Sequence, residues 1–252
     1  MAAAALAGSL AGCHGKPAPP QPLAPKGETS ADAGYIPAPS LDAAESSAGG
    51  VRLQGTAQPR ARVRLAPPSG EALFAPADGR GRWRIVLPVA PGAWIFGLSM
   101  AADGRQVQAQ GYVLVTASGR AAVLRAGAGA IVLGPPAPPR LTAVDFDRQG
   151  GAVVSGLAGP QAAVSVRVDG RPGAVGRADA GGRFSLALPQ PLTPGSHQVE
   201  IVGDAFTDTV AVDATPATAL SGGPFRATAA AGGLRADWMT PGGGVQSTWI
   251  LN

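Results

Sequence analysis

Cysteine and histidine are nearly absent from this sequence, and their scarcity excludes several classes of site. Cys13 is the single cysteine among 252 residues, so no disulfide can form within the chain. The two histidines, His14 and His197, are too few for a metal cluster of the usual Cys/His spacing. We therefore predict that the protein holds no metal and no cofactor.

Aromatic and charged residues are also scarce. Aromatic residues make up 5% of the chain and charged residues 14%, whereas nucleic-acid surfaces need stacking platforms and dense positive charge. The formal net charge is only +4, and 18 of the 20 basic residues are Arg. We expect no nucleic-acid partner.

Glycine, proline and small apolar residues dominate instead. The 37 Gly and 25 Pro disfavour long helices, while the 45% hydrophobic content is enough for real cores. This composition favours short strands separated by turns. The predicted fold class is all-β, with a loose segment attached.

The N-terminus contains a short apolar run that ends at the lone cysteine. Residues 2–11 are too few to span a bilayer, which takes about 20 residues, but they fit the apolar core of a signal peptide. The tetrapeptide Leu10-Ala11-Gly12-Cys13 resembles a bacterial lipobox, whose cysteine is acylated and becomes the new N-terminus. The resemblance implies a signal peptide at 1–12 and lipidation at Cys13. The alternative is an Ala-rich N-terminus with an incidental cysteine.

A Pro- and Ala-rich segment follows the cysteine. Residues 13–50 have almost no large apolar side chains, so we predict a disordered linker that holds a folded body away from a membrane. By analogy with bacterial sorting, His14 in place of Asp after the acylated cysteine favours the outer membrane. The predicted location is the periplasmic face of a cell-envelope membrane, through the lipid anchor.

The body of the chain contains an internal repeat. A shift of 101 residues aligns 55–88 with 156–189 without a gap. Identical pairs include Gly55/Gly156, Asp78/Asp179, Gly81/Gly182 and Arg82/Arg183, and Trp83 is matched by Phe184. Both copies alternate apolar and polar residues in short runs, which is typical of half-buried strands in a β-sandwich.

The repeated pattern G-x-A-x-P … A-D-x-x-G-R-[WF]-x-[ILV]-x-L-P resembles bacterial Ig-like repeat domains. Such domains occur in tandem in envelope and adhesin proteins as non-enzymatic spacers or binding units. The resemblance implies Ig-like sandwiches at 51–133 and 140–215, joined by a Pro-rich linker at 134–139. Residues 216–252 complete the prediction as a C-terminal hairpin segment, docked on the second domain because an isolated hairpin is marginally stable.

No catalytic constellation emerges from the polar residues, so we predict that the protein is not an enzyme. His197 takes a core-facing strand position and is expected to pack in the sandwich. Asp78 and Asp179 are equivalent turn residues, and Asp145 and Asp147 are expected to face solvent. The Gly-rich runs at 125–130 and 241–246 lack the Lys-Ser/Thr of a phosphate loop and are expected to form turns.

The arginines of the first copy give the one candidate binding surface. We predict a face for an anionic ligand at Arg60, Arg62, Arg64, Arg80 and Arg84. The matching residues of the second copy are Gln161, Ala163, Ser165, Gly181 and Ser185, so the fold does not require these arginines. A plain solvated strand face is the other interpretation, and it suits a chain in which Arg is the default exposed charge.

These observations predict a non-catalytic, lipid-anchored cell-envelope protein that acts as a binding or spacing module. Its partners would be a membrane, through the anchor, and a cell-wall polymer or an envelope protein. One alternative is a peptidoglycan or polysaccharide binder that uses the basic face of the first domain. Another is an accessory subunit of an envelope enzyme.

Overall fold

The computed structural model describes residues 35–252 except 48, 89–91, 117, 135–139, 205 and 231. Within these ranges every regular element is a β-strand, which confirms the all-β fold class. None of the described segments is a helix long and apolar enough to cross a membrane. The predicted signal peptide, Cys13, the predicted disordered linker up to residue 34, and residues 135–139 of the predicted linker at 134–139 lie outside the described residues.

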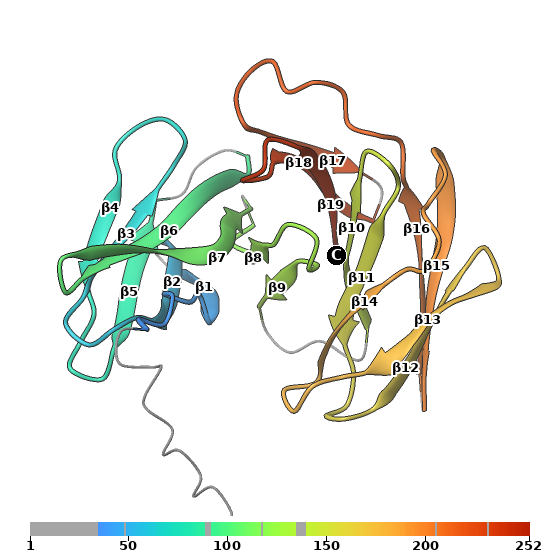
Figure 1. Ribbon diagram of the computed structural model, residues 1–252, viewed down its shortest axis with the longest axis horizontal. Helices are drawn as coiled ribbons and strands as arrows, with labels where there is room; N and C mark the ends of the chain where they lie inside the picture. The colour runs from blue at the N-terminus through green and yellow to red at the C-terminus, as the bar shows by residue number, and fades with distance from the viewer. Residues whose placement is uncertain are drawn as a thin grey trace, which may run out of the picture. The chain divides into compact units, whose positions relative to one another are not determined.

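The first sandwich consists of two antiparallel sheets of nine strands in total (Figure 1). One sheet has the order β1-β2-β5 and the other β4-β3-β6-β7-β8-β9. The strands are β1 Ala43–Ser47, β2 Gly50–Thr56, β3 Arg62–Ala66, β4 Leu73–Pro76, β5 Arg82–Leu87, β6 Trp94–Ala102, β7 Arg105–Val115, β8 Ala121–Leu124 and β9 Ile131–Leu133. Their facing side chains form one core, with Leu53, Val63, Leu65 and Met100 fully buried.

The second sandwich repeats this plan. Its sheets have the orders β14-β11-β10, extended by β19-β18-β17, and β13-β12-β15-β16. The strands are β10 Arg140–Asp147, β11 Ala152–Leu157, β12 Ala163–Val168, β13 Arg171–Arg177, β14 Arg183–Ala187, β15 Ser196–Gly203 and β16 Phe206–Asp213. The first seven strands of each sandwich therefore follow the same order, as two tandem Ig-like sandwiches should.

The repeat predicted from sequence extends to individual hydrogen bonds. The Asp78 carboxylate accepts from the backbone N–H of Arg80 and Arg82 at 2.8 and 2.9 Å. Asp179 does the same for Gly181 and Arg183 at 2.8 and 2.9 Å. These carboxylates close equivalent turns, as predicted for Asx-type residues.

The repeated glycine has a packing reason. A Cβ on Gly156 would lie 2.4 Å from the Phe184 ring and 2.4 Å from the Arg140 carbonyl oxygen, and Gly55 is pressed in the same way against Trp83. Only a residue without a side chain lets the ring cover the neighbouring strand.

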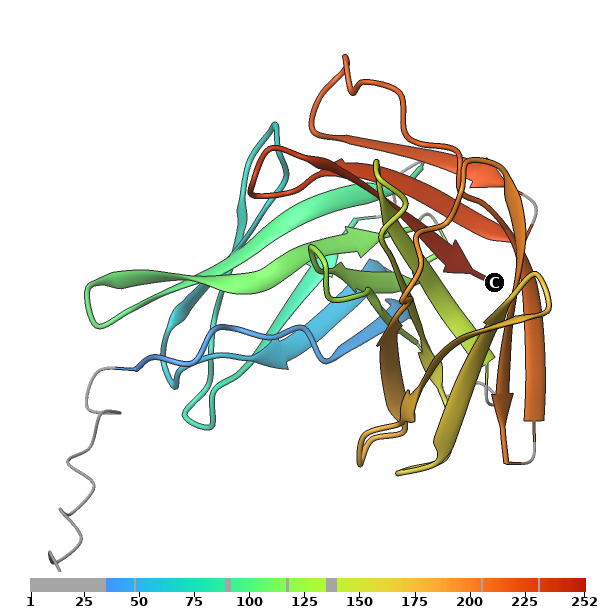
Figure 2. The ribbon, with the colours of Figure 1, turned by 45° about the vertical axis from the view of Figure 1, so that its right-hand side comes forward.

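The C-terminal segment confirms the predicted hairpin and goes beyond it. Its strands are β17 Phe225–Ala230, β18 Gly233–Met239 and β19 Val245–Leu251. Strands β18 and β19 pair as predicted, and β19 also pairs with β10 from Ala143↔Ile250 to Asp147↔Gln246. The three strands therefore extend the second sandwich's sheet and do not merely rest on it (Figure 2).

A third hydrophobic core lies between the two sandwiches. Strands β6, β7 and β8 contribute Ile95, Leu114, Ala122 and Leu124, while β10, β18 and β19 contribute Ala143, Ala236, Trp238 and Ile250. Because neighbouring residues on these strands enter different cores, β6 to β8 of the first sandwich and β10 and β19 of the second are covered on both faces. The described residues from 36 onward accordingly form one compact unit.

The predicted linker boundary at residue 50 is wrong for its last part. Strand β1 begins at Ala43, and Leu41 and Ala44 are buried in the first core. Few apolar residues are needed here because β1 is an edge strand that gains its backbone hydrogen bonds from β2. The composition of residues 40–47 therefore gave no strand signal.

Trp238 is the largest side chain in the third core, and its removal should uncouple the sandwiches. It is fully buried, donates from Nε1 to Thr248 Oγ1 at 3.0 Å and meets the Tyr112 ring edge-on at 5.7 Å. We expect Trp238→Ala to lower the free energy of unfolding by about 3–5 kcal/mol in urea denaturation.

The matched control is Met239→Ala, next to Trp238 on β18, whose side chain is 41% exposed. It should change the free energy of unfolding by less than about 1 kcal/mol. Equal losses in the two variants would contradict a central role for the third core.

Candidate functional site

The structure distributes the predicted basic face over two opposite surfaces. Arg62 and Arg64 lie on β3, where Val63 and Leu65 point into the first core. Arg84 lies on β5 of the other sheet, where Trp83 and Ile85 point into the same core from the opposite side. Side chains that alternate with buried ones along a strand point away from the core, so the arginines of β3 and that of β5 point to opposite sides of the sandwich.

The two remaining arginines of that set lie in turns at one end of the sandwich. The backbone N–H of Arg60 donates to the Asp78 carbonyl at 3.2 Å, and that of Arg80 donates to the Asp78 carboxylate. Arg62 rests over the Phe74 ring at 4.0 Å. The structure therefore brings Arg60 near Arg80, and Arg62 near Arg64, but it does not bring all five together, because Arg84 lies on the other sheet.

His197 packs in the second sandwich, as the repeat predicts. Its ring is nearly buried; Nδ1 lies 2.7 Å from Asp169 Oδ2 and Nε2 lies 2.7 Å from the Thr193 carbonyl oxygen. A carbonyl and a carboxylate only accept, so both ring nitrogens donate. The Thr193 carbonyl and then Asp169 raise the pKa of His197. With both nitrogens occupied by these acceptors, the ring has no nitrogen free to act as a general base.

Asp145 is buried, so the expectation that it faces solvent is wrong. Its carboxylate accepts from the backbone N–H of Ala130 at 2.7 Å, from Thr248 Oγ1 at 2.5 Å and from Gln246 Nε2 at 3.1 Å. Burial raises the pKa of Asp145 to about 6, against the lowering effect of these hydrogen bonds. This carboxylate connects the 125–130 loop of the first sandwich to β19. Asp147, by contrast, is exposed as predicted.

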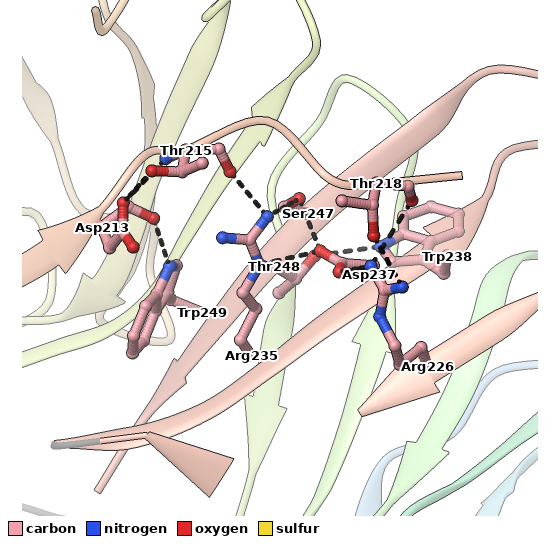
Figure 3. Close-up of polar contacts among 10 residues, drawn as sticks. All are labelled: Asp213, Thr215, Thr218, Arg226, Arg235, Asp237, Trp238, Ser247, Thr248 and Trp249. Carbon is pink, nitrogen blue, oxygen red and sulfur yellow. Dashed lines mark hydrogen bonds and ion pairs between the residues drawn. The ribbon is translucent and has the colours of Figure 1, made fainter. Parts of the chain in front are cut away.

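A second buried carboxylate, Asp237, organises the other face of the C-terminal strands (Figure 3). It accepts from Arg226 at 2.6 Å, from Arg235 Nε at 2.9 Å and from Ser247 Oγ at 2.7 Å. Burial raises its pKa, but the hydrogen bonds from the two arginines and Ser247 outweigh burial, so the pKa of Asp237 is lowered.

The same arginines fasten the segment that leads from the second sandwich to β17. Arg235 donates to the Thr215 carbonyl at 2.7 Å, and Arg226 donates to Thr218 Oγ1 at 2.9 Å. Trp249 Nε1 adds a bond to the Asp213 carbonyl at 3.0 Å (Figure 3). The side chains around Asp237 form hydrogen bonds with one another and with the nearby backbone, so we assign this network a structural role.

A cleft of about 340 Å³ lies between residues 125–132 and the outer face of β11 and β14. Arg125, Arg177 and Arg183 line it, together with Thr142 and Ser185. The sequence reasoning missed this site, because only the packing of the two sandwiches brings Arg125 to Arg177 and Arg183. One signal was available: the repeat places Pro76 where the second copy has Arg177, and Arg84 where it has Ser185.

Within the described segments, no group of three or more His, Cys, Asp or Glu side chains could hold a metal ion.

The chain has no match among family models or among curated proteins. It is similar to a solved structure titled "Biofilm associated protein - BSP domain", with a TM-score of 0.26 and 15% identity over 72% of this chain and 30% of that chain. It is also similar to "Central Fibronectin-III array of RIM-binding protein", with a TM-score of 0.27 and 14% identity over 81% of this chain and 72% of that chain. The Ig-like fold assignment rests on the strand order and not on these scores.

The stability of the protein between about pH 4 and 6.5 should report on Asp145. Its folded pKa of about 6 exceeds the ordinary 3.8, so its ionisation costs stability as the pH rises through this window. The other aspartates with shifted pKa values have lowered ones, so they change the stability only below about pH 3.8. The raised pKa of His197 makes the stability fall only as the pH rises above about 6.5. Relative to Asp145→Asn, the wild type should gain roughly 2 kcal/mol from pH 7 to pH 4.

Urea denaturation at several pH values measures this difference. A gap between wild type and Asp145→Asn that stays constant from pH 4 to 7 would show that Asp145 does not titrate abnormally.

Proposed function

We propose that the chain is a non-catalytic, lipid-anchored module of a bacterial cell envelope, in which two Ig-like sandwiches act as one rigid binding and spacing body. The observation that carries the proposal is the third core. Tandem domains joined only by a linker move relative to each other, whereas a shared apolar core resists such motion. Rigidity of this kind suits a body that holds a ligand or a partner at a fixed position.

The anchor in this proposal is Cys13 within Leu10-Ala11-Gly12-Cys13. Two acyl chains would be needed for stable attachment, because a single chain binds a membrane only marginally. The Pro-rich residues after Cys13 would act as a spacer between the membrane and the first buried side chains near Leu41.

Metabolic labelling with an alkyne fatty acid tests the anchor in a bacterial host that expresses the full chain. Wild-type protein should be labelled and should fractionate with membranes, because the acyl chains on Cys13, and not the short apolar run before it, would hold the protein on the membrane. The Cys13→Ser variant should lose the label, while the neighbouring His14→Ala variant should keep it. An unlabelled wild type, or a labelled Cys13→Ser variant, would refute the anchor.

A further inference from the structure

We propose that the cleft between residues 125–132 and strands β11 and β14 binds the oxyanion of a negatively charged sugar, whether a phosphate or a carboxylate. The inference deepens the proposed function and rests on it, because it supplies the ligand of the binding module. It also moves the expected anionic ligand from the first sandwich to the contact between the two sandwiches.

The three arginines of the cleft are held by backbone carbonyls. Arg125 donates to the Gly129 and Ala128 carbonyls at 2.9 and 3.0 Å. Arg177 donates to the Gln161 carbonyl at 3.0 Å and Arg183 to the Val132 carbonyl at 3.2 Å. Neutral carbonyls orient a guanidinium but leave its charge, and its remaining N–H groups can form bidentate contacts with an anion.

Arg183 differs from its repeat-equivalent in a way that the fold does not require. In the first copy, Arg82 Nε lies 3.2 Å from the Asp78 carboxylate and pairs with it. In the second copy, Arg183 reaches instead to Val132, although Asp179 Oδ1 accepts from the same two backbone N–H positions as Asp78 Oδ1. The cleft therefore contains three guanidinium groups and one carboxylate among its lining residues.

Hydroxyl groups complete the floor of the cleft. Ser155 Oγ and Ser185 Oγ lie 3.0 Å apart on paired positions of β11 and β14. One of these hydroxyls donates to the other, so the second keeps its hydrogen for a ligand. The first sandwich has Gln54 and Arg84 at the same paired positions, so the two serines are particular to this sheet.

The dimensions of the cleft fit a single sugar unit. Its volume of about 340 Å³ lies near the lower end of small-molecule sites, which range from about 300 to 1,000 Å³. Gly129 lets the loop approach closely, because a Cβ there would lie 2.4 Å from Ser155 Oγ. A monosaccharide with one charged group matches both the size and the balance of arginines and hydroxyls.

Isothermal titration of the full chain, made as Cys13→Ser so that it stays unacylated, tests the site. The probes are glucose 6-phosphate, glucuronate and neutral glucose. At least one charged sugar should bind, and neutral glucose should not. Tighter binding of the phosphate or of the carboxylate then identifies the preferred oxyanion.

Arg177→Ala and Arg183→Ala should each weaken that binding about tenfold or more, through loss of a charge-assisted contact. Arg177 is exposed on β13, so this variant should keep the wild-type melting temperature even if Arg183→Ala does not. Arg148→Ala, an exposed arginine of the same sandwich outside the cleft, should bind as the wild type does.

The inference is overturned if neither charged sugar binds, if neutral glucose binds equally well, or if Arg177→Ala and Arg183→Ala both bind as the wild type does. These outcomes are independent of fatty-acid labelling at Cys13. Failure of the ligand site and failure of the anchor can therefore be told apart.

Discussion

The burial of Trp238, Ile250 and Leu114 between the two sandwiches is the interaction on which the rest of the structure depends. Without the C-terminal strands, β10 would be a sheet edge, and β6 to β8 would expose an apolar face to solvent. Strand β19 pairs with the edge of β10, and β18 covers the apolar face of the first sandwich. The result is one body of four sheets with three cores.

Polar groups at the same junction determine which apolar surfaces meet. Asp145 receives hydrogen bonds from Ala130 of the first sandwich and from Thr248 of β19, so its burial is compensated only when the two parts are in register. The 125–130 loop that satisfies Asp145 also supplies Arg125 to the proposed anion cleft. Ligand binding and the contact between the sandwiches therefore share one segment, and each should stabilise the other.

The sequence allowed the sandwiches to be predicted because their signals are local. Alternation around Val63 and Trp83, the turn at Asp78 and the 101-residue repeat each depend on a few neighbouring residues. The junction between the sandwiches depends instead on segments more than a hundred residues apart, such as Asp145 and Thr248. The cleft likewise depends on segments from both sandwiches. The consecutive buried residues of Val113–Val115 and β19 did carry a signal, since strands covered on both faces lose their alternation. The position of Asp145 was mispredicted because alternation alone does not reveal a second covering layer.

Differential scanning calorimetry of the full chain tests the central claim most directly. Sandwiches that share a core should unfold together, in a single transition whose calorimetric enthalpy equals its van't Hoff enthalpy. Two resolved transitions, each with the enthalpy of one sandwich, would contradict the account and would indicate two independent domains joined by a linker.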